Sequence, residues 1–222
     1  MADKPRVKAP KQRAGSSSET DSRRRALVIG AAIAGVALGF VVVVALLGLV
    51  GGGGGTDEEA LQARFEAAGC TFEAAPALEG AHSVRQPGGT SDRWNTDPPT
   101  TGPHFGIAAI FGIYADELEI ARVVHNLEHG GIYILYGEDV PEETVAELRD
   151  FYDSHKTGTI MAPLSRLGDE FALGAWVADG DTDSGFLAKC TEFDEDAVSS
   201  FFRSLQFRGP ERFDPSQLRP GL

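Results

Sequence analysis

Residues 116–136 read DELEIARVVHNLEHGGIYILY, and this stretch decides the fold because it joins a helix directly to a strand. Ile120, Val124 and Leu127 recur at the 3.6-residue period of one helix face. Residues 132–136, IYILY, are wholly apolar and rich in β-prone side chains, which is typical of a buried strand. We therefore predict a helix that packs against a sheet at this point of the chain.

The ends of this helix are also marked in the sequence. Asp116 is placed to cap its N-terminus, with Glu119 completing a reciprocal cap three residues later. The two glycines that follow His129 end the helix. An alternative, favoured by the β-branched valines in the middle of the stretch, is a hairpin over residues 122–136.

The chain beyond residue 56 mixes helical and extended patterns. Apolar periodicity predicts helices at 57–68, 141–156 and 194–206 and strands at 159–162 and 171–178. Residues 71–103, rich in proline and glycine, are expected to form a long loop. Residues 210–222 are expected to form an extended tail. Together these patterns predict one compact α+β domain over residues 57–209.

The N-terminal part has the composition of a membrane anchor. Residues 1–25 hold eight basic and three acidic side chains without apolar periodicity, which predicts a disordered tail. Residues 26–50 carry no charged side chain, and a helix needs about 20 apolar residues to span a bilayer. The arginines at 23–25 place the tail in the cytoplasm by the positive-inside rule. Residues 51–56 then link the span to an extracytoplasmic domain of a single-pass cell-membrane protein.

Two further interpretations concern residues 26–50. A cleavable signal peptide is an alternative to the anchor, but its apolar region is usually only about 7–15 residues long. Ala31, Gly35 and Gly39 recur every four residues on one face of the predicted helix. Small residues at this spacing let two membrane helices approach closely, so the chain is a candidate homodimer.

The charge of the chain changes sign after the span. Residues 56–222 hold 12 basic and 30 acidic side chains. A surface of this charge repels nucleic acid and anionic lipid headgroups, and it attracts cations. Nucleic acid is therefore excluded as a partner, whereas an envelope protein remains possible.

Cys70 and Cys190 are the two cysteines of the chain, and both belong to the acidic part. In an oxidising compartment an even number of cysteines is most simply explained by a disulfide. Closing so long a loop would stabilise the fold by about 4–5 kcal/mol in the chain-entropy model. The alternative is a pair of thiolate metal ligands.

Residues 125–129, His-Asn-Leu-Glu-His, match the H-x-x-E-H pattern of one class of zinc peptidases. On a helix His125, Glu128 and His129 share one face, so both imidazoles could hold one metal ion. On a strand the two histidines would stand about 13 Å apart, at roughly 3.3 Å per residue, which is too far for one ion. The metal hypothesis therefore depends on the local secondary structure.

A second stretch, PPTTGPHF at residues 98–105, presents His104 on a turn. The prolines fix φ and Gly102 permits an unusual backbone angle, so the turn is expected to be rigid. Such a turn suits a metal ligand or a general base. In the alternative, the ring nitrogens of His104 bind the carbonyls of the turn itself. His82, in the predicted long loop, is a further candidate ligand.

The stretches PPTTGPHFG and VHNLEHGG, the flanking cysteines and the later ALGAW segment together resemble the bacterial domain-of-unknown-function family 3105. The resemblance extends over roughly residues 60–208, and it implies an envelope protein with one N-terminal span. Thr101 stands where serine is common in the family. The resemblance implies functional positions at His82, His104, His125, Glu128 and His129, with the cysteines Cys70 and Cys190. It implies no reaction, substrate or cofactor.

Three functional hypotheses follow. The leading one is a zinc or copper site built from His104, His125 and His129, with His82 and Glu128 as further ligands or as supporting groups. Its role would be accessory to the envelope or in metal homeostasis. The second is a zinc-dependent hydrolase with Glu128 as general base. The third is a metal-free domain that binds another protein.

Overall fold

The computed structural model describes residues 57–83, 94–180 and 182–221. The predicted basic tail, membrane span and glycine-rich linker lie outside these residues, as does the candidate dimer face at Ala31, Gly35 and Gly39. Within the described ranges, the helices are too short or too polar to cross a membrane.

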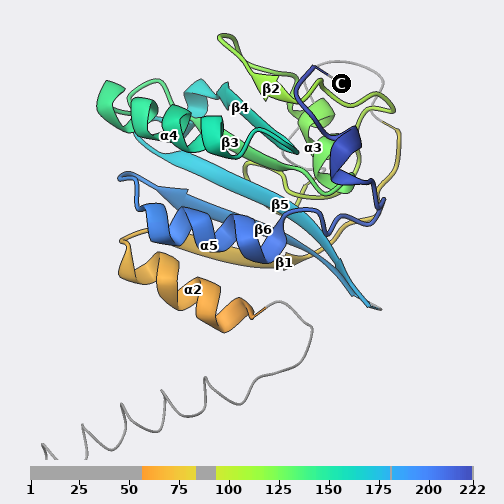
Figure 1. Cartoon of the computed structure of the whole chain (residues 1–222). Helices are drawn as coiled ribbons and strands as arrows, with labels where there is room; N and C mark the ends of the chain where they lie inside the picture. Colours follow the sequence, from red (N-terminus) through yellow and green to blue (C-terminus); the bar gives the residue numbers. More distant parts are fainter. Residues whose placement is uncertain (1–56, 84–93, 181, 222) are drawn as a thin grey trace, which may run out of the picture. The chain divides into compact units, whose positions relative to one another are not determined.

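A six-stranded mixed sheet forms the centre of the domain (Figure 1). Its order is β1-β6-β5-β3-β4-β2, and β4 runs parallel to both β3 and β2 while the other neighbours are antiparallel. The strands are β1 (Thr71–Pro76), β2 (Gly112–Ile113), β3 (Ile132–Tyr136), β4 (Thr159–Pro163), β5 (Phe171–Asp179) and β6 (Thr182–Cys190). The helices are α2 (Glu58–Ala67), α3 (Ile120–Glu128), α4 (Glu142–Ser154) and α5 (Glu195–Leu205). The predicted α+β class is confirmed.

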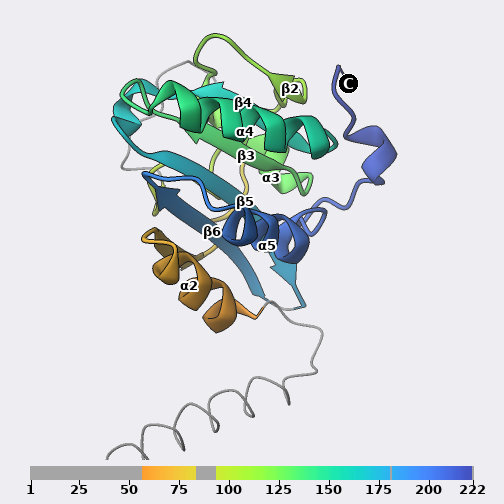
Figure 2. The ribbon, with the colours of Figure 1, turned by 60° about the vertical axis from the view of Figure 1, so that its left-hand side comes forward.

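The central strand β3 separates two apolar cores because its successive side chains point to opposite faces. Ile132 and Ile134 pack in one core with side chains from α2, α4 and α5. Tyr133 and Leu135 pack in the other core with side chains from α3. Helices α2 and α5 contact each other and lie side by side in two views (Figure 1, Figure 2). Helix α3 therefore lies on the opposite face of the sheet from the other three helices.

The predicted helix at 116–129 is confirmed, but its predicted start is wrong. Helix α3 begins at Ile120, and Glu119 at its N-cap makes no side-chain capping bond, so the reciprocal cap at Asp116 does not form. The chain before α3 is held at the sheet edge instead, because the Tyr114 amide donates to the Met161 carbonyl of β4.

The end of α3 agrees with the sequence, and the hairpin alternative for residues 122–136 is wrong. Gly130 has a φ of +86°, a conformation that glycine adopts without steric cost, and β3 begins two residues later. The other predicted helices and strands are confirmed to within two residues of their ends.

Three strands were missed by the sequence patterns, and one of them, β2, has only two residues. Strand β1 lies in the predicted long loop; most of its residues are exposed or half-exposed, so it lacks a strong apolar pattern. Strand β6 begins with polar residues and contains a glycine. The register Thr71↔Lys189 brings Cys70 beside Cys190, and the two form a disulfide with a Cα–Cα distance of 4.4 Å. The predicted disulfide is confirmed.

The expected extended tail is wrong for the residues after 210 that the structure describes. Residues Pro215–Gln217 form a 3-10 helix capped by Asp214. Leu218 is 2% exposed and packs in the core on the α3 side of the sheet. Its carbonyl accepts a hydrogen bond from the Gly158 amide. The physical reason is that Leu218 adds apolar area to the face of the sheet on which, among the described α-helices, only the short α3 packs.

Candidate metal centre

The turn before His104 is fixed on the sheet by threonine hydroxyls. Thr96 and Thr100 share a hydrogen bond of 3.0 Å, and the Thr96 hydroxyl also accepts from the Thr100 amide. The Thr101 hydroxyl accepts from the Leu78 amide. A Cβ at Gly185 of β6 would stand 2.1 Å from the Thr100 hydroxyl, so the turn lies directly on the strand at this glycine. These hydrogen bonds and the close packing on β6 hold the turn in place.

His104 is fully buried, with an exposed fraction of 0%. Its ring Nδ1 lies 2.8 Å from the carbonyl oxygen of Gly102 and must donate to it, since a carbonyl only accepts. Its backbone amide donates to the Ala81 carbonyl, which holds the segment leading to His82 against the turn. This single backbone hydrogen bond therefore brings together two histidines that are 22 residues apart in the sequence.

His125 is presented by α3 and held in the same way. Its Nδ1 lies 2.6 Å from the Phe105 carbonyl, to which it donates. Its neighbour Asn126 fixes the loop above the helix, because its amide group both accepts from the Ala109 amide and donates to the Ala109 carbonyl. In His104 and in His125 the bond at Nδ1 leaves Nε2 as the nitrogen that carries a free lone pair.

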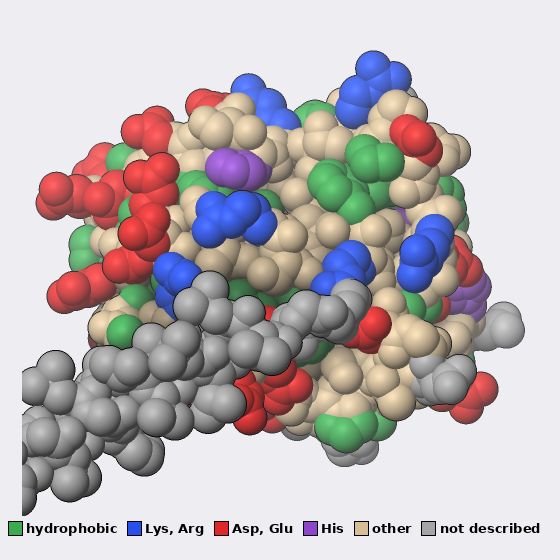
Figure 3. All heavy atoms as spheres, turned by 60° about the horizontal axis from the view of Figure 1, so that its bottom comes forward, with side chains coloured by type: hydrophobic (Ala, Val, Ile, Leu, Met, Phe, Trp, Pro, Cys, Tyr) green, Lys and Arg blue, Asp and Glu red, His purple; other side chains and the backbone are tan. Residues whose placement is uncertain are grey.

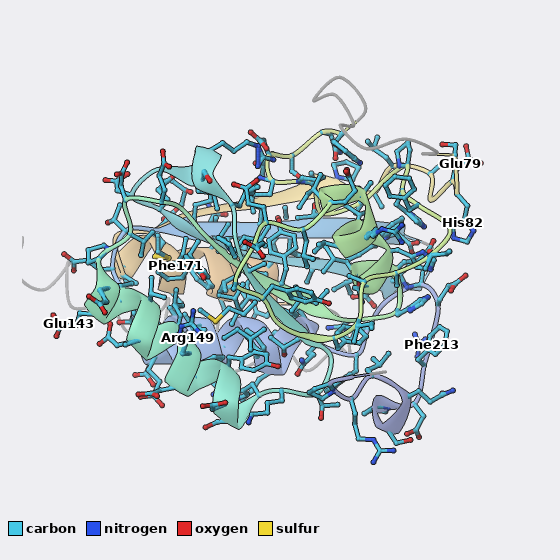
Figure 4. The ribbon with its side chains drawn as sticks, turned by 90° about the horizontal axis from the view of Figure 1, so that it is seen from above. Glu79, His82, Glu143, Arg149, Phe171 and Phe213 are labelled. Atoms are coloured by element: carbon cyan, nitrogen blue, oxygen red, sulfur yellow. A yellow bond between two sulfur atoms is a disulfide. The ribbon has the colours of Figure 1, made fainter. Side chains whose placement is uncertain are left out.

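Three imidazole rings and one carboxylate converge at His104, near the C-terminal end of the turn. The ring centroids of His82, His104 and His125 are 4.9 Å apart in every pairing. Oε2 of Glu128 lies 3.0 Å from Nε2 of His104 and 3.6 Å from Nε2 of His82. One donor atom from each of the four residues lies within 4.8 Å of all the others. We call these four residues the inner set; Figure 4 shows its member His82 beside Glu79 at one edge of the molecule.

Two buried polar atoms at the centre of the inner set face each other without a hydrogen bond. Nε2 of His104 and Oε2 of Glu128 are both inaccessible to solvent, and neither has a hydrogen-bond partner among the described residues. They are 3.0 Å apart, but their relative orientation does not satisfy hydrogen-bond geometry. A neutral imidazole and a carboxylate would direct lone pairs at each other here, and a cation between them removes that repulsion.

The pKa values of these groups are shifted by burial and by their mutual charges. Burial lowers the pKa of His104, but the Glu128 carboxylate and the Gly102 carbonyl raise it by more, so it lies above the ordinary value. Burial raises the pKa of Glu128, yet the adjacent His104 and the other imidazoles lower it overall. Burial lowers the pKa of His125, which keeps its ring neutral. The Glu128 carboxylate therefore favours a positive charge beside it.

His129 does not join the inner set. Its Nε2 lies 3.2 Å from Oε2 of Glu211, and its ring centroid lies 4.2 Å from that of the tilted Phe213 ring, which Figure 4 labels. Donor atoms of His125, His129 and Glu211 form a second group within 4.8 Å. The combination of His104, His125 and His129 that the sequence suggested is thus divided between two groups that share His125.

Sequence patterns missed three residues that shape the site. Glu211 lies in a segment without periodicity and carries no signal. Trp176, which belongs to the ALGAW segment, packs its ring edge-on to His104 at 6.1 Å. A Cβ at Gly80 would stand 2.6 Å from Oε1 of Glu128 and 2.8 Å from the Trp176 ring, so the backbone of Gly80 lies directly against the site.

Gly80→Ala is expected to displace the Glu128 carboxylate and to lower the affinity of the site for zinc by about 10-fold, as loss of a supporting contact does. Gly106→Ala is the matched control, because a Cβ there meets His82 at an ordinary 3.7 Å. The zinc affinities of the two variants are compared by titration against a competing chelator. Equal affinities in both would show that Gly80 does not position Glu128.

Comparison with known proteins gives a family without an assigned activity. No curated protein and no solved structure matches the chain. The family described as "Protein of unknown function (DUF3105)" matches residues 87–217, which include His104, His125, Glu128 and Glu211 but not His82. The match covers more than half of the chain and confirms the family that the two histidine motifs indicated, although it begins at residue 87 and not at the expected residue 60. The chain belongs to the DUF3105 family.

Proposed function

We propose that the domain binds one divalent transition-metal ion, zinc or copper(II), through His82, His104, His125 and Glu128. The single observation that carries this proposal is the buried pair of His104 Nε2 and Glu128 Oε2, which face each other at 3.0 Å without a hydrogen bond. Buried polar groups almost always have partners, and a metal ion supplies both of these atoms with one.

The donor types favour zinc or copper(II). Imidazole suits both ions, whereas calcium and magnesium prefer sites made only of oxygen. In a tetrahedral zinc site, ligand atoms about 2.0–2.1 Å from the ion are roughly 3.4 Å from one another. The inner set spans up to 4.8 Å, so binding requires a small inward movement. His82 is the member best able to move, since its side chain is 51% exposed.

The hydrogen bonds at Nδ1 support metal binding rather than a purely structural role. In the metal-free interpretation the histidines serve to bind backbone carbonyls, and His104 and His125 do bind them. Metal-ligating histidines also donate their second ring N–H to a carbonyl or carboxylate, which fixes the ring for the metal. A purely structural role for His104 would leave its Nε2 facing Oε2 of Glu128 at 3.0 Å without a hydrogen bond.

The hydrolase alternative is less well supported by the position of Glu128. A general base must reach a water or substrate that stands clear of the ligands. Oε2 of Glu128 instead lies among the donors, 3.0 Å from Nε2 of His104 and 3.6 Å from Nε2 of His82. This position suits a ligand better than a base.

We further propose that the domain lies outside the cell membrane, anchored by residues 26–50 with the N-terminus in the cytoplasm, in an envelope accessory or metal-homeostasis role. The Cys70–Cys190 disulfide supports an oxidising compartment. An envelope protein is the partner class that fits this location. The acidic surface, visible as Asp and Glu side chains along one edge in Figure 3, supports the exclusion of nucleic acid.

The metal content of the full-length protein, purified without a histidine tag, tests the proposal. We expect close to one zinc or copper ion per chain, and an affinity at least about 10-fold weaker in His82→Ala, which removes a ligand but leaves no buried cavity. His155→Ala is the matched control, because His155 follows α4 and lies outside the donor groups.

Weak binding of cations to the acidic surface is distinguished from binding at the inner set by the histidine variants. A cleft lined by Asp139, Glu143, Glu147, Asp169 and Glu192 could attract cations weakly, and none of its lining residues belongs to the inner set. Ions held in this cleft are removed by salt, and their number per chain is expected to be the same in His82→Ala and in His155→Ala. A wild-type protein that remains metal-free after reconstitution with zinc and with copper(II) would contradict the proposed function.

A further inference from the structure

A second donor group lies beside the inner set and shares one residue with it. His129 and Glu211 form an ion-pair contact of 3.2 Å, and the His129 ring lies 4.6 Å from the His125 ring. The side chains of His129 and Glu211 are 16% and 48% exposed, so this group opens to solvent. We call His125, His129 and Glu211 the outer set.

The shared residue prevents both sets from being filled at once. Nδ1 of His125 is occupied by its hydrogen bond to the Phe105 carbonyl. Its Nε2 is then the one ring nitrogen free to bind an ion, and a lone pair binds one ion at a time. An ion held by all three residues of the outer set therefore excludes an ion held by all four residues of the inner set.

The backbone fixes Glu211 in this position. The Glu211 amide donates to the Glu128 carbonyl, and the Phe207 amide donates to the Gly130 carbonyl. A Cβ at Gly209 would stand 2.2 Å from the Gly130 nitrogen, so this segment lies flat on the end of α3. Glu128 itself thus has its side chain in the inner set and its carbonyl bonded to the segment that carries Glu211.

We infer that the outer set is a transfer position through which the ion enters and leaves the inner set. The inference rests on the proposed function, because it concerns the same ion. His125 stays bound throughout, while His129 and Glu211 replace His104, His82 and Glu128. Each set contains one carboxylate, so the charge around the ion does not change during transfer. Exchange of ligands one by one avoids a free cation in a buried site, which would be costly.

Zinc exchange in the full-length protein tests the inference. We expect Glu211→Gln to keep one zinc per chain and to keep the equilibrium affinity within about threefold, while zinc release to excess chelator slows about 10-fold. Uptake must slow by the same factor, since the equilibrium constant is the ratio of the two rates. His129→Gln is expected to act in the same direction. Glu138→Gln makes the same chemical change at an exposed residue outside both sets and is the control.

The outcomes separate the two proposals. Unchanged exchange rates in both Glu211→Gln and His129→Gln, or two zinc ions per wild-type chain, would overturn the transfer position and leave the inner site intact. A wild-type chain that binds no zinc would instead overturn the proposed function, and the transfer position with it. Slower exchange at unchanged affinity, with normal rates in Glu138→Gln, would support the inference.

Discussion

Glu128→Gln is expected to weaken zinc binding by at least about 100-fold while leaving the domain folded. Loss of a group that only supports a ligand already costs about 10–100-fold in metal affinity, and Glu128 supplies the only carboxylate of the inner set. Glutamine keeps the volume of the side chain, so no cavity is formed. Competition against a chelator of known affinity measures the loss.

The same substitution has a second expected effect in the metal-free protein. Burial lowers the pKa of His104, and the Glu128 carboxylate is the main group that raises it. Removal of the negative charge is therefore expected to lower the pKa of His104. An NMR titration of the imidazole resonances after metal removal tests the direction of this pKa change. We expect His104 to lose its proton at a higher pH in the wild-type protein than in Glu128→Gln.

The acid sensitivity of zinc binding follows from these directions. Ligands must lose their protons before they bind a metal, so affinity falls as pH drops below the pKa of each histidine. His104, whose pKa is raised, is the first to compete, and His125, whose pKa is lowered, competes only at more acidic pH. In Glu128→Gln the onset of this competition shifts to lower pH.

Glu79→Gln is the control for these measurements, because Glu79 is exposed and close in sequence to His82 yet is not a member of the donor groups. It is expected to retain wild-type affinity and a wild-type titration of His104. A Glu128→Gln protein that binds zinc as tightly as Glu79→Gln would remove Glu128 from the ligand set. The buried pair with His104 would then need another explanation.

The sequence located the candidate site through its local motifs. Helical periodicity around His125 placed Glu128 on the same face, and the glycines after His129 ended the helix where the structure ends it. The turn that carries His104 was recognisable from its prolines and from Gly102. These features depend on interactions between residues close in the chain, and such interactions leave a readable pattern.

Sequence reasoning did not determine how the donors divide into two groups. The separation of His129 from the inner set depends on Glu211, which lies 82 residues further along the chain and reaches His129 through backbone contacts at Gly130. His82 joins the inner set through the pairing of the Ala81 carbonyl with the His104 amide. Neither tertiary contact has a counterpart in local periodicity.

The missed strand β1 has a similar cause. An edge strand whose side chains are mostly exposed or half-exposed has little apolar alternation, and its place in the sheet is set by its partner β6. The cysteines carried the information that the pattern lacked. Cys70 precedes β1 and Cys190 ends β6, so the predicted disulfide already implied that these two segments are neighbours.

Removal of that disulfide by Cys70→Ala/Cys190→Ala is expected to lower the free energy of unfolding by about 5 kcal/mol. The bond joins residues 120 positions apart, and closing a loop of this length removes much of the entropy of the unfolded chain. Domains are commonly stable by only about 5–15 kcal/mol, so the variant would be marginal. Denaturant unfolding of the variant and of oxidised wild-type protein measures the difference.

The position of the bond also predicts where the variant opens first. Among the described strands, β1 lies at the edge of the sheet and pairs with β6, and the disulfide adds a covalent link between the ends of these two strands. Amide hydrogens of β1 should then exchange faster, whereas those of the central strand β3 should follow global unfolding. Zinc affinity under native conditions should change by less than about threefold, because His82 is held by the contact of Ala81 with His104 rather than by β1. A loss of stability below about 1 kcal/mol would mean that the unfolded chain is already compact around this pair and that loop entropy is not what the disulfide contributes.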